Sequence, residues 1–112
     1  MTKTVAVVIP SYRVTAHILQ VIAEIGPEVQ HIYVVDDACP DGSGLLVESQ
    51  CTDPRVKVLC HTVNQGVGGA VLTGYAAALD DNVDIIVKVD GDGQMKPELI
   101  PYFIAPIALG QA

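Results

Sequence analysis

Two groups of carboxylates, both predicted to follow strands, carry the clearest chemical signal in this sequence. One is the pair Asp36 and Asp37, and the other is Asp90 and Asp92, with Gln94 two residues further on. Carboxylates gathered at one edge of a sheet repel each other unless a positive charge neutralises them. A hard divalent cation prefers oxygen ligands, which Asp90, Asp92 and Gln94 offer at every second position. We therefore predict a metal or ligand site; the alternative is that these Asp-Gly sequences form only polar turns.

A run of glycines between a predicted strand and a predicted long helix is the second candidate. Residues 61–70 contain Gly66 and Gly68, and glycines at the start of a helix let backbone N–H groups approach a phosphate. The run departs from the dinucleotide fingerprint, because Val71 stands where that pattern ends in glycine, and it lacks the lysine of a phosphate-binding P-loop. Contact with an anion and close packing of the helix on the sheet both fit this pattern.

Several single residues near these groups have less specific chemistry. Tyr12 follows the first predicted strand, where it can stack on a nucleobase or pack at the rim of the sheet. Lys88 falls inside a predicted buried strand, where an unpaired charge is costly; it can reach toward the carboxylates, but we assign it no role. His17, His31 and His61 lack the spacing of metal ligands and are predicted to be structural or exposed.

Alternating strand and helix patterns must position these residues. Runs of β-branched residues predict strands buried on both faces at residues 3–10, 31–35, 55–60 and 83–89, the first of them ended by Pro10. Apolar residues at helical spacing predict helices at 14–25, at 43–50 with Ser43 as N-cap, at 66–79 and from 98 onward. This alternation predicts an α/β fold, three-layered and Rossmann-like, around a mostly parallel sheet. Ligands of such sheets bind at the carboxyl ends of the strands.

Length, charge and composition restrict the class of protein. A chain of 112 residues with 50% hydrophobic content suits a single domain over residues 1–112. Six basic against thirteen acidic residues give a net charge of −7, which speaks against nucleic acid as the partner. No apolar run is long enough to span a bilayer and no signal peptide is recognisable, so we expect a cytoplasmic protein. Three cysteines without Cys-x-x-Cys spacing predict reduced thiols.

Four motifs, in order along the chain, resemble one enzyme family. They are VVIPSYR (7–13), VVDDACPDGS (34–43), NQGVGGA (64–70) and VDGDGQMKPE (89–98). Together they resemble the N-terminal half of family 2 glycosyltransferases with the GT-A fold, and most of all the polyprenyl-phosphate branch, which includes dolichol-phosphate mannose synthases. The resemblance implies a partial GT-A fold that binds a UDP- or GDP-linked sugar. It also implies an inverting transfer of a hexose to a polyprenyl phosphate or a glycan.

The resemblance assigns roles to residues near the first three strands. Pro10 and Tyr12 would line the pocket for the nucleobase. Asp36 would hydrogen-bond the base, with Asp37 nearby. Gly66 would belong to the set that binds the nucleotide sugar.

After the fourth predicted strand, the resemblance implies a metal site. Asp90, Gly91 and Asp92 would contact the nucleotide sugar, and the two carboxylates would also hold the Mg²⁺ or Mn²⁺ that bridges its diphosphate. Gln94 would join them as a metal ligand. Such a cation acts as a Lewis acid that stabilises the departing nucleotide diphosphate.

Two departures from the family pattern limit what this chain is expected to do alone. Many relatives have an acid two residues after the tyrosine, where this chain has Val14. The family's second half, with the acceptor site and the general base, has no counterpart here, so we expect a truncated glycosyltransferase domain with no catalytic base of its own. The whole protein would supply these parts and would lie at the cytoplasmic face of a membrane. Assembly into an oligomer is compatible with the sequence.

Two other functions fit part of the pattern. A receiver domain that accepts a phosphoryl group is a parallel α/β domain of this size with acids at strand ends, but there the acidic pair follows the first strand. In this chain the pair follows the second predicted strand. A non-catalytic nucleotide-binding module is the other alternative.

Overall fold

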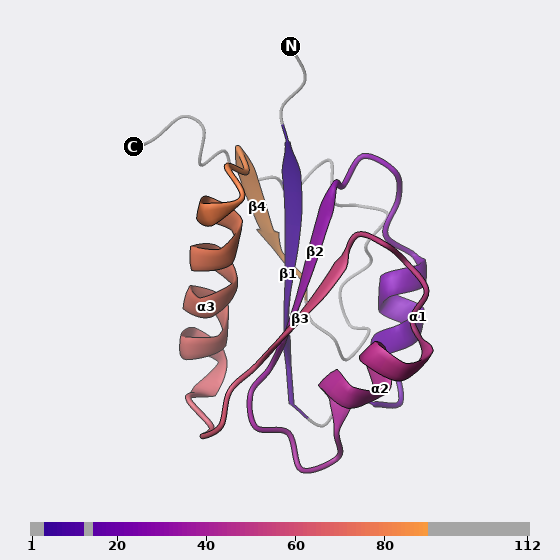
Figure 1. The fold of residues 1–112 in the computed structure, drawn as a ribbon, viewed down its shortest axis with the longest axis vertical. Helices are drawn as coiled ribbons and strands as arrows, with labels where there is room; N and C mark the ends of the chain where they lie inside the picture. The colour runs from indigo at the N-terminus through magenta and orange to yellow at the C-terminus, as the bar shows by residue number, and fades with distance from the viewer. Residues whose placement is uncertain (1–3, 13–14, 90–112) are drawn as a thin grey trace.

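The computed structural model describes residues 4–12 and 15–89, which form one parallel sheet of four strands between two layers of helices (Figure 1). The strands lie in the order β3-β2-β1-β4, and every pairing is parallel. Their bounds are Val5–Ser11 for β1, His31–Asp36 for β2, Val56–Cys60 for β3 and Ile85–Lys88 for β4. The predicted α/β architecture with a parallel sheet is therefore confirmed.

Helices cover both faces of the sheet. The helices α1 (Ile18–Ala23) and α2 (Ser43–Gln50) lie on one face, and α3 (Gly66–Asp80) lies on the other (Figure 1). Each face has its own apolar cluster, because the β-branched strand residues point alternately to the two sides. Val7 and Ile9 of β1 belong to the cluster under α1 and α2, and Ala6 and Val8 belong to the cluster under α3. This is the three-layer arrangement that the sequence predicts.

The strand β1 continues to Ser11, one residue beyond its predicted end at Pro10. The Val5 carbonyl accepts from Gln30 and the Ser11 carbonyl accepts from Asp37, so the odd-numbered residues of β1 bond toward β2. Pro10 therefore faces the β4 side, two residues beyond Val8, the last residue of β1 whose pairing with β4 falls within the described residues. Because its missing N–H points away from β2, Pro10 does not interrupt the pairing of β1 with β2.

The structure corrects three further details of the sequence prediction. The first helix spans Ile18–Ala23 and is shorter than the predicted 14–25. Gly42, at φ 71°, is the N-cap of α2, so Ser43 is the first residue of that helix. Lys88 ends β4 with an exposed side chain and so avoids the cost of a buried charge. The helix predicted from residue 98 lies outside the described residues.

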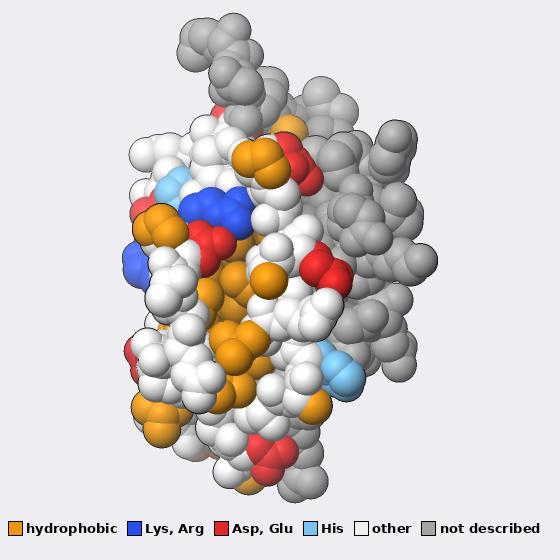
Figure 2. All heavy atoms as spheres, turned by 90° about the vertical axis from the view of Figure 1, so that its right-hand side faces the viewer, with side chains coloured by type: hydrophobic (Ala, Val, Ile, Leu, Met, Phe, Trp, Pro, Cys, Tyr) orange, Lys and Arg blue, Asp and Glu red, His pale blue; other side chains and the backbone are white. Residues whose placement is uncertain are grey.

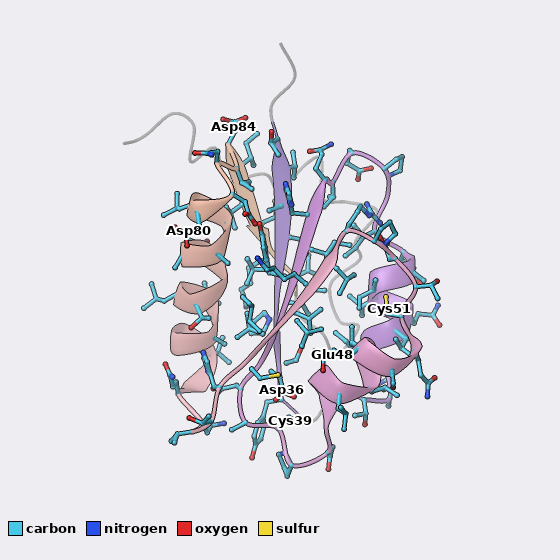
Figure 3. The ribbon with its side chains drawn as sticks, in the orientation of Figure 1. Asp36, Cys39, Glu48, Cys51, Asp80 and Asp84 are labelled. Carbon is cyan, nitrogen blue, oxygen red and sulfur yellow. The ribbon has the colours of Figure 1, made fainter. Side chains whose placement is uncertain are left out.

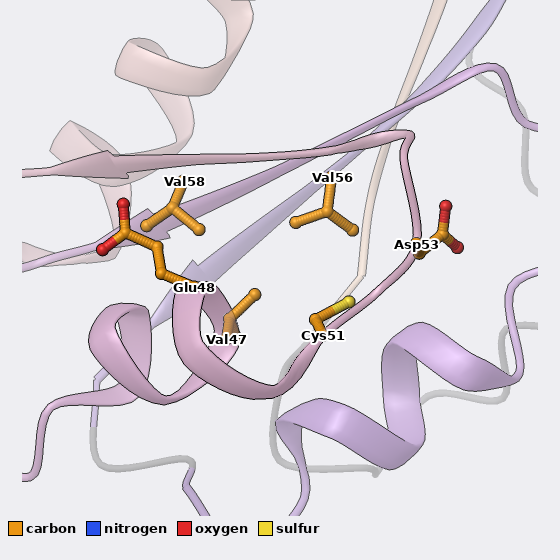
Figure 4. A pocket seen from close by; sticks show the side chains of 6 residues that line it. All are labelled: Val47, Glu48, Cys51, Asp53, Val56 and Val58. Carbon is orange, nitrogen blue, oxygen red and sulfur yellow. The ribbon is translucent and has the colours of Figure 1, made fainter.

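Two hollows between described residues lie on the face of the sheet that α1 and α2 cover, and neither is lined by a predicted site residue. One, of about 360 Å³, lies between α2 and β3, where Val47, Cys51 and Val58 point into it (Figure 4). A second, of about 480 Å³, lies between α1 and the segment that connects α2 to β3. Figure 2 shows the apolar side chains that gather on this face. Within 4–12 and 15–89, no helix is long and apolar enough to cross a membrane.

Candidate functional site

The carboxyl ends of β1 and β2 bring the first predicted site residues together. Pro10 pairs with Val35 and Ser11 pairs with Asp36, so both strands end at the same level. The next N–H, that of Asp37, donates to the Ser11 carbonyl at 3.0 Å. Tyr12 follows directly, with 43% of its surface exposed. The predicted grouping of an aromatic residue with two carboxylates at this edge is therefore present in the structure.

The Asp36 carboxylate organises the turn that leads into α2. One oxygen accepts the Cys39 backbone N–H at 2.7 Å, and the other accepts the Gly44 N–H at 2.9 Å. Asp36 and Cys39 lie close together at the lower end of the sheet in Figure 3. Asp36 is 8% exposed. Each carboxylate oxygen can accept more than one hydrogen bond, so Asp36 keeps acceptor capacity for a ligand.

Glycine at position 44 allows this close approach. A Cβ built on Gly44 would lie 2.7 Å from an oxygen of Asp36 and 2.8 Å from the Asp36 Cβ. Both distances are shorter than van der Waals contact, so any larger residue would push the carboxylate away. The sequence Asp36 to Gly44 thus acts as one unit, in which the glycine lets the first turn of α2 rest on the acid.

Asp37 is more deeply buried than Asp36, at 3% exposure, and accepts three hydrogen bonds. Its Oδ1 accepts from His61 Nδ1 at 2.8 Å and from the Gln65 N–H at 2.7 Å, and its Oδ2 accepts from the Gly66 N–H at 2.8 Å. Burial alone raises the pKa of this carboxyl, but the bonds from His61, Gln65 and Gly66 together hold the pKa below its ordinary value of 3.8. Asp37 is therefore an ionised acid that ties the loop before α3 to the end of β2.

The same loop contains Gly66, the predicted contact for a phosphate. Gly66 has φ 81°, in the left-handed region where glycine is favoured, and its N–H donates to Asp37 and to Asn64 Oδ1 at 3.1 Å. Among the described residues, nothing lies within 4 Å of where a Cβ of Gly66 or Gly68 would stand. The Gly66 N–H thus serves the chain itself, while no described residue fills the space beside either glycine.

His61 is the residue at this edge that sequence reasoning did not single out for the site. It follows β3 directly, donates to Asp37 through Nδ1, and lies 2.7 Å from Thr73 Oγ1 through Nε2. The prediction that His61 is structural or exposed is consistent with this buried ring. The sequence signal that could have identified His61 is its position: it directly follows a strand, as Asp37 does in the neighbouring parallel strand.

The predicted metal ligands belong to the segment after β4. The Val89 N–H donates to the Val8 carbonyl at 3.0 Å, which continues the pairing with β1 by one bond. Asp90, Gly91, Asp92 and Gln94 lie outside the described residues. Within the described part, no three His, Cys, Asp or Glu side chains are grouped so that they could hold a metal ion. Cys39, Cys51 and Cys60 form no disulfide among the described residues.

Solved structures with the same arrangement define the class of fold. The chain matches a mannosyltransferase from Pyrobaculum calidifontis in complex with GDP-Man and Mn²⁺, with a TM-score of 0.66 and 24% identity over 82% of this chain and 28% of that one. It also matches glucosyl-3-phosphoglycerate synthase from Mycobacterium tuberculosis in complex with Mn²⁺, UDP and glucosyl-3-phosphoglycerate, with a TM-score of 0.71 and 25% identity over 89% and 38%. These neighbours are GT-A glycosyltransferases, so the four-stranded sheet is the corresponding part of a GT-A fold.

The family model for glycosyl transferase family 2 matches residues 6–112, and the chain belongs to this family. An undecaprenyl-phosphate mannosyltransferase from Micrococcus luteus is 38% identical over 77 residues, 68% of this chain and 32% of that protein. A polyprenol monophosphomannose synthase from Mycolicibacterium smegmatis is 33% identical over 97% of this chain and 43% of that protein. The chain thus spans less than half the length of each of these relatives. Family membership favours the glycosyltransferase hypothesis over the receiver domain.

Proposed function

We propose that this chain is the donor-binding half of a metal-dependent, inverting glycosyltransferase that transfers a hexose from a nucleoside diphosphate to a polyprenyl phosphate. The observation that carries the proposal is the meeting of Pro10, Tyr12 and Asp36 at the carboxyl edge of a family 2 sheet. The names of the relatives, which act on undecaprenyl or polyprenol phosphates, support the lipid acceptor. The M. tuberculosis neighbour, crystallised with UDP and Mn²⁺, supports a nucleotide donor.

In this proposal the base binds between Tyr12 and Asp36. The partly exposed Tyr12 ring offers a stacking surface, and the Asp36 carboxylate accepts a hydrogen bond from a base N–H. Two backbone N–H groups hold Asp36 in place before the ligand arrives, so little ordering is needed on binding. Asp37 contributes to the same edge by accepting hydrogen bonds from Gln65 and Gly66, which fix the loop before α3.

Mg²⁺ or Mn²⁺ is assigned to Asp90, Asp92 and Gln94, with Gly91 beside the nucleotide sugar. The donor set fits these hard cations because it consists of carboxylate and amide oxygens. A chain with net charge −7 also needs a cation to hold a diphosphate, since the Gly66 N–H is already engaged by Asp37. When bound, the metal supplies Lewis-acid stabilisation of the leaving diphosphate.

The acceptor site and the general base are assigned to the part of the whole protein that corresponds to the rest of its relatives. A polyprenyl phosphate carries its phosphate at a membrane surface because its hydrocarbon chain is apolar. We therefore propose that the whole protein works at the cytoplasmic face of a membrane.

The test is calorimetric titration of the whole protein with GDP-mannose and with UDP-glucose, each with and without Mn²⁺. We expect one of the two to bind only when Mn²⁺ is present, and Asp92→Asn to weaken that binding about tenfold or more. The matched control is Asp80→Asn, an exposed acid near the far end of α3, which should leave the affinity unchanged. Binding that does not need a metal, or no binding by the folded protein, contradicts the proposal.

A transfer assay with undecaprenyl phosphate then separates an enzyme from a non-catalytic binding module. The proposal expects a lipid-linked sugar that forms only with the donor that binds. A protein that binds the nucleotide sugar with Mn²⁺ yet forms no glycosylated lipid would be a binding module for that donor.

A further inference from the structure

His61 connects three elements at the proposed donor edge. His61 directly follows β3 in the chain, and its side chain is 7% exposed. Nδ1 lies 2.8 Å from Asp37 Oδ1, and Nε2 lies 2.7 Å from Thr73 Oγ1 in α3. Because the ionised Asp37 carboxylate can only accept, Nδ1 carries a proton. The imidazole thus joins the end of β2 to the second turn of α3.

The connection holds in both protonation states of the imidazole. Thr73 Oγ1 lies 2.7 Å from the ring nitrogen and 3.1 Å from the Gly69 carbonyl, and its single proton can go to either. With a neutral ring, the Thr73 hydroxyl donates to Nε2. With a protonated ring, Nε2 donates to Thr73, whose hydroxyl turns to Gly69. Every polar atom keeps a partner in either state, so the ring is held in one place.

The Asp37 bond is the part of this connection that reaches the proposed site. Asp37 Oδ1 is shared between His61 and the Gln65 N–H, and the Asp37 carbonyl accepts the Asn64 side chain at 3.1 Å. The Asp37 N–H in turn donates to the Ser11 carbonyl, next to Tyr12. A shift of the Asp37 carboxylate therefore moves both the loop before α3 and the strand ends that would flank a nucleobase.

We propose that His61 is a positioning residue for donor binding: its bond to Asp37 fixes the carboxyl edge on which the nucleotide sugar lies. This inference rests on the proposed function of that edge. His61 contacts no donor atom in this role and acts only through Asp37. Thr73 orients the ring but carries less of the effect, because the Asp37 bond is the one nearer the ligand.

Two amide substitutions separate the two ring nitrogens. His61→Asn places an N–H close to the position of Nδ1 and can still donate to Asp37, whereas the longer side chain of His61→Gln places its amide near Nε2 and serves Thr73. We expect His61→Ala and His61→Gln to weaken binding of the donor with Mn²⁺ by about tenfold, and His61→Asn to stay within about threefold of the wild type. His17→Ala, an exposed histidine before α1, is the matched control.

The measurement is the dissociation constant of GDP-mannose or UDP-glucose with Mn²⁺ for the whole protein, beside the thermal unfolding midpoint of each variant. Since Asn and Gln both remove the ring, a purely structural role would lower the unfolding midpoint and the affinity of both variants alike. Equal affinity of His61→Gln and His61→Asn, or wild-type affinity of His61→Ala, overturns the inference and leaves the proposed function standing. A wild-type protein that binds neither nucleotide sugar overturns both. If His61→Ala fails to fold, the comparison of Asn with Gln still decides.

Discussion

Replacing Asp37 with Asn should destabilise the protein by about 2–3 kcal/mol near neutral pH, because three N–H donors converge on the Asp37 carboxylate. An Asn side chain has one acceptor oxygen. If that oxygen faces His61 and Gln65, the amide NH₂ faces the Gly66 N–H, and this N–H loses its bond to the side chain at position 37. A hydrogen bond to a charged acceptor contributes about 1.5–3 kcal/mol. The Gly66 N–H retains its bond to Asn64, which keeps the expected loss from exceeding this range.

The effect should depend on pH in a direction that the structure fixes. Burial raises the pKa of Asp37, but its hydrogen bonds outweigh burial, so the folded-state pKa lies below the ordinary value of 3.8. The unfolded chain therefore binds the proton more tightly than the folded chain. The stabilisation from the carboxylate is present above the unfolded pKa and is lost as the pH falls through the folded pKa. The difference in stability between wild type and Asp37→Asn should be large at about pH 6 and shrink below about pH 4.

Urea unfolding of the wild type and Asp37→Asn, followed by circular dichroism from about pH 3 to pH 7, measures this difference. Asp80→Asn, an exposed acid on α3, controls for the loss of one negative charge. Equal stability of Asp37→Asn and wild type at pH 6 would refute the reasoning, and so would a difference that stays constant down to pH 3.

Three other substitutions test the geometry elsewhere. Gly44→Ala should cost about 1–2 kcal/mol in urea unfolding, because overpacking against Asp36 exceeds the gain in helix propensity; no loss would contradict the close approach. Arg55→Lys should cost about 1–2 kcal/mol by the same method, since one ammonium cannot replace the bonds of a guanidinium to three backbone carbonyls; an unchanged midpoint would show those bonds to be dispensable. Tyr33→Phe should raise the pKa of Asp81 toward 3.8 in an NMR titration, because the Tyr33 hydroxyl bond is the largest cause that lowers it; an unmoved pKa would assign the shift to other charges.

The sheet and its layers could be predicted from sequence because they depend on local patterns. Uninterrupted β-branched runs mark strands buried on both faces. Each predicted strand begins and ends within three residues of the observed bounds. The edge where Pro10 and Asp36 meet follows from parallel pairing alone. Errors concern places where a partner strand decides the outcome. Pro10 stays in β1 because the pairing with β2 continues through Ser11 and Asp36, and Lys88 is exposed at the last position of its strand.

The hydrogen-bond network of Asp37 could not be predicted in the same way. His61 lies 24 positions from Asp37 and 12 positions from Thr73 in the sequence, so only the pairing of β3 with β2 and the packing of α3 on β1 and β2 bring them together. The prediction that Ser43 caps α2 was wrong for a related reason. The N-cap is Gly42, in the left-handed conformation, because Asp36 draws the following turn inward through its bonds from Cys39 and Gly44.

The same network changes the electrostatic argument for the acidic edge. Clustered carboxylates suggest a cation, yet Asp36 and Asp37 accept five hydrogen bonds from the chain's own N–H groups. Two of the donors, Gly44 and Gly66, lie in the first turns of helices α2 and α3, whose N-termini are partially positive. Hydrogen bonds from the chain itself therefore satisfy both carboxylates without a metal between them. In the proposed function a cation is required only once a diphosphate binds, and its ligands would come from other oxygens. The sequence offers such oxygens after β4, which is why metal dependence should follow Asp92, while base affinity should follow Asp36 and the His61 bond behind it.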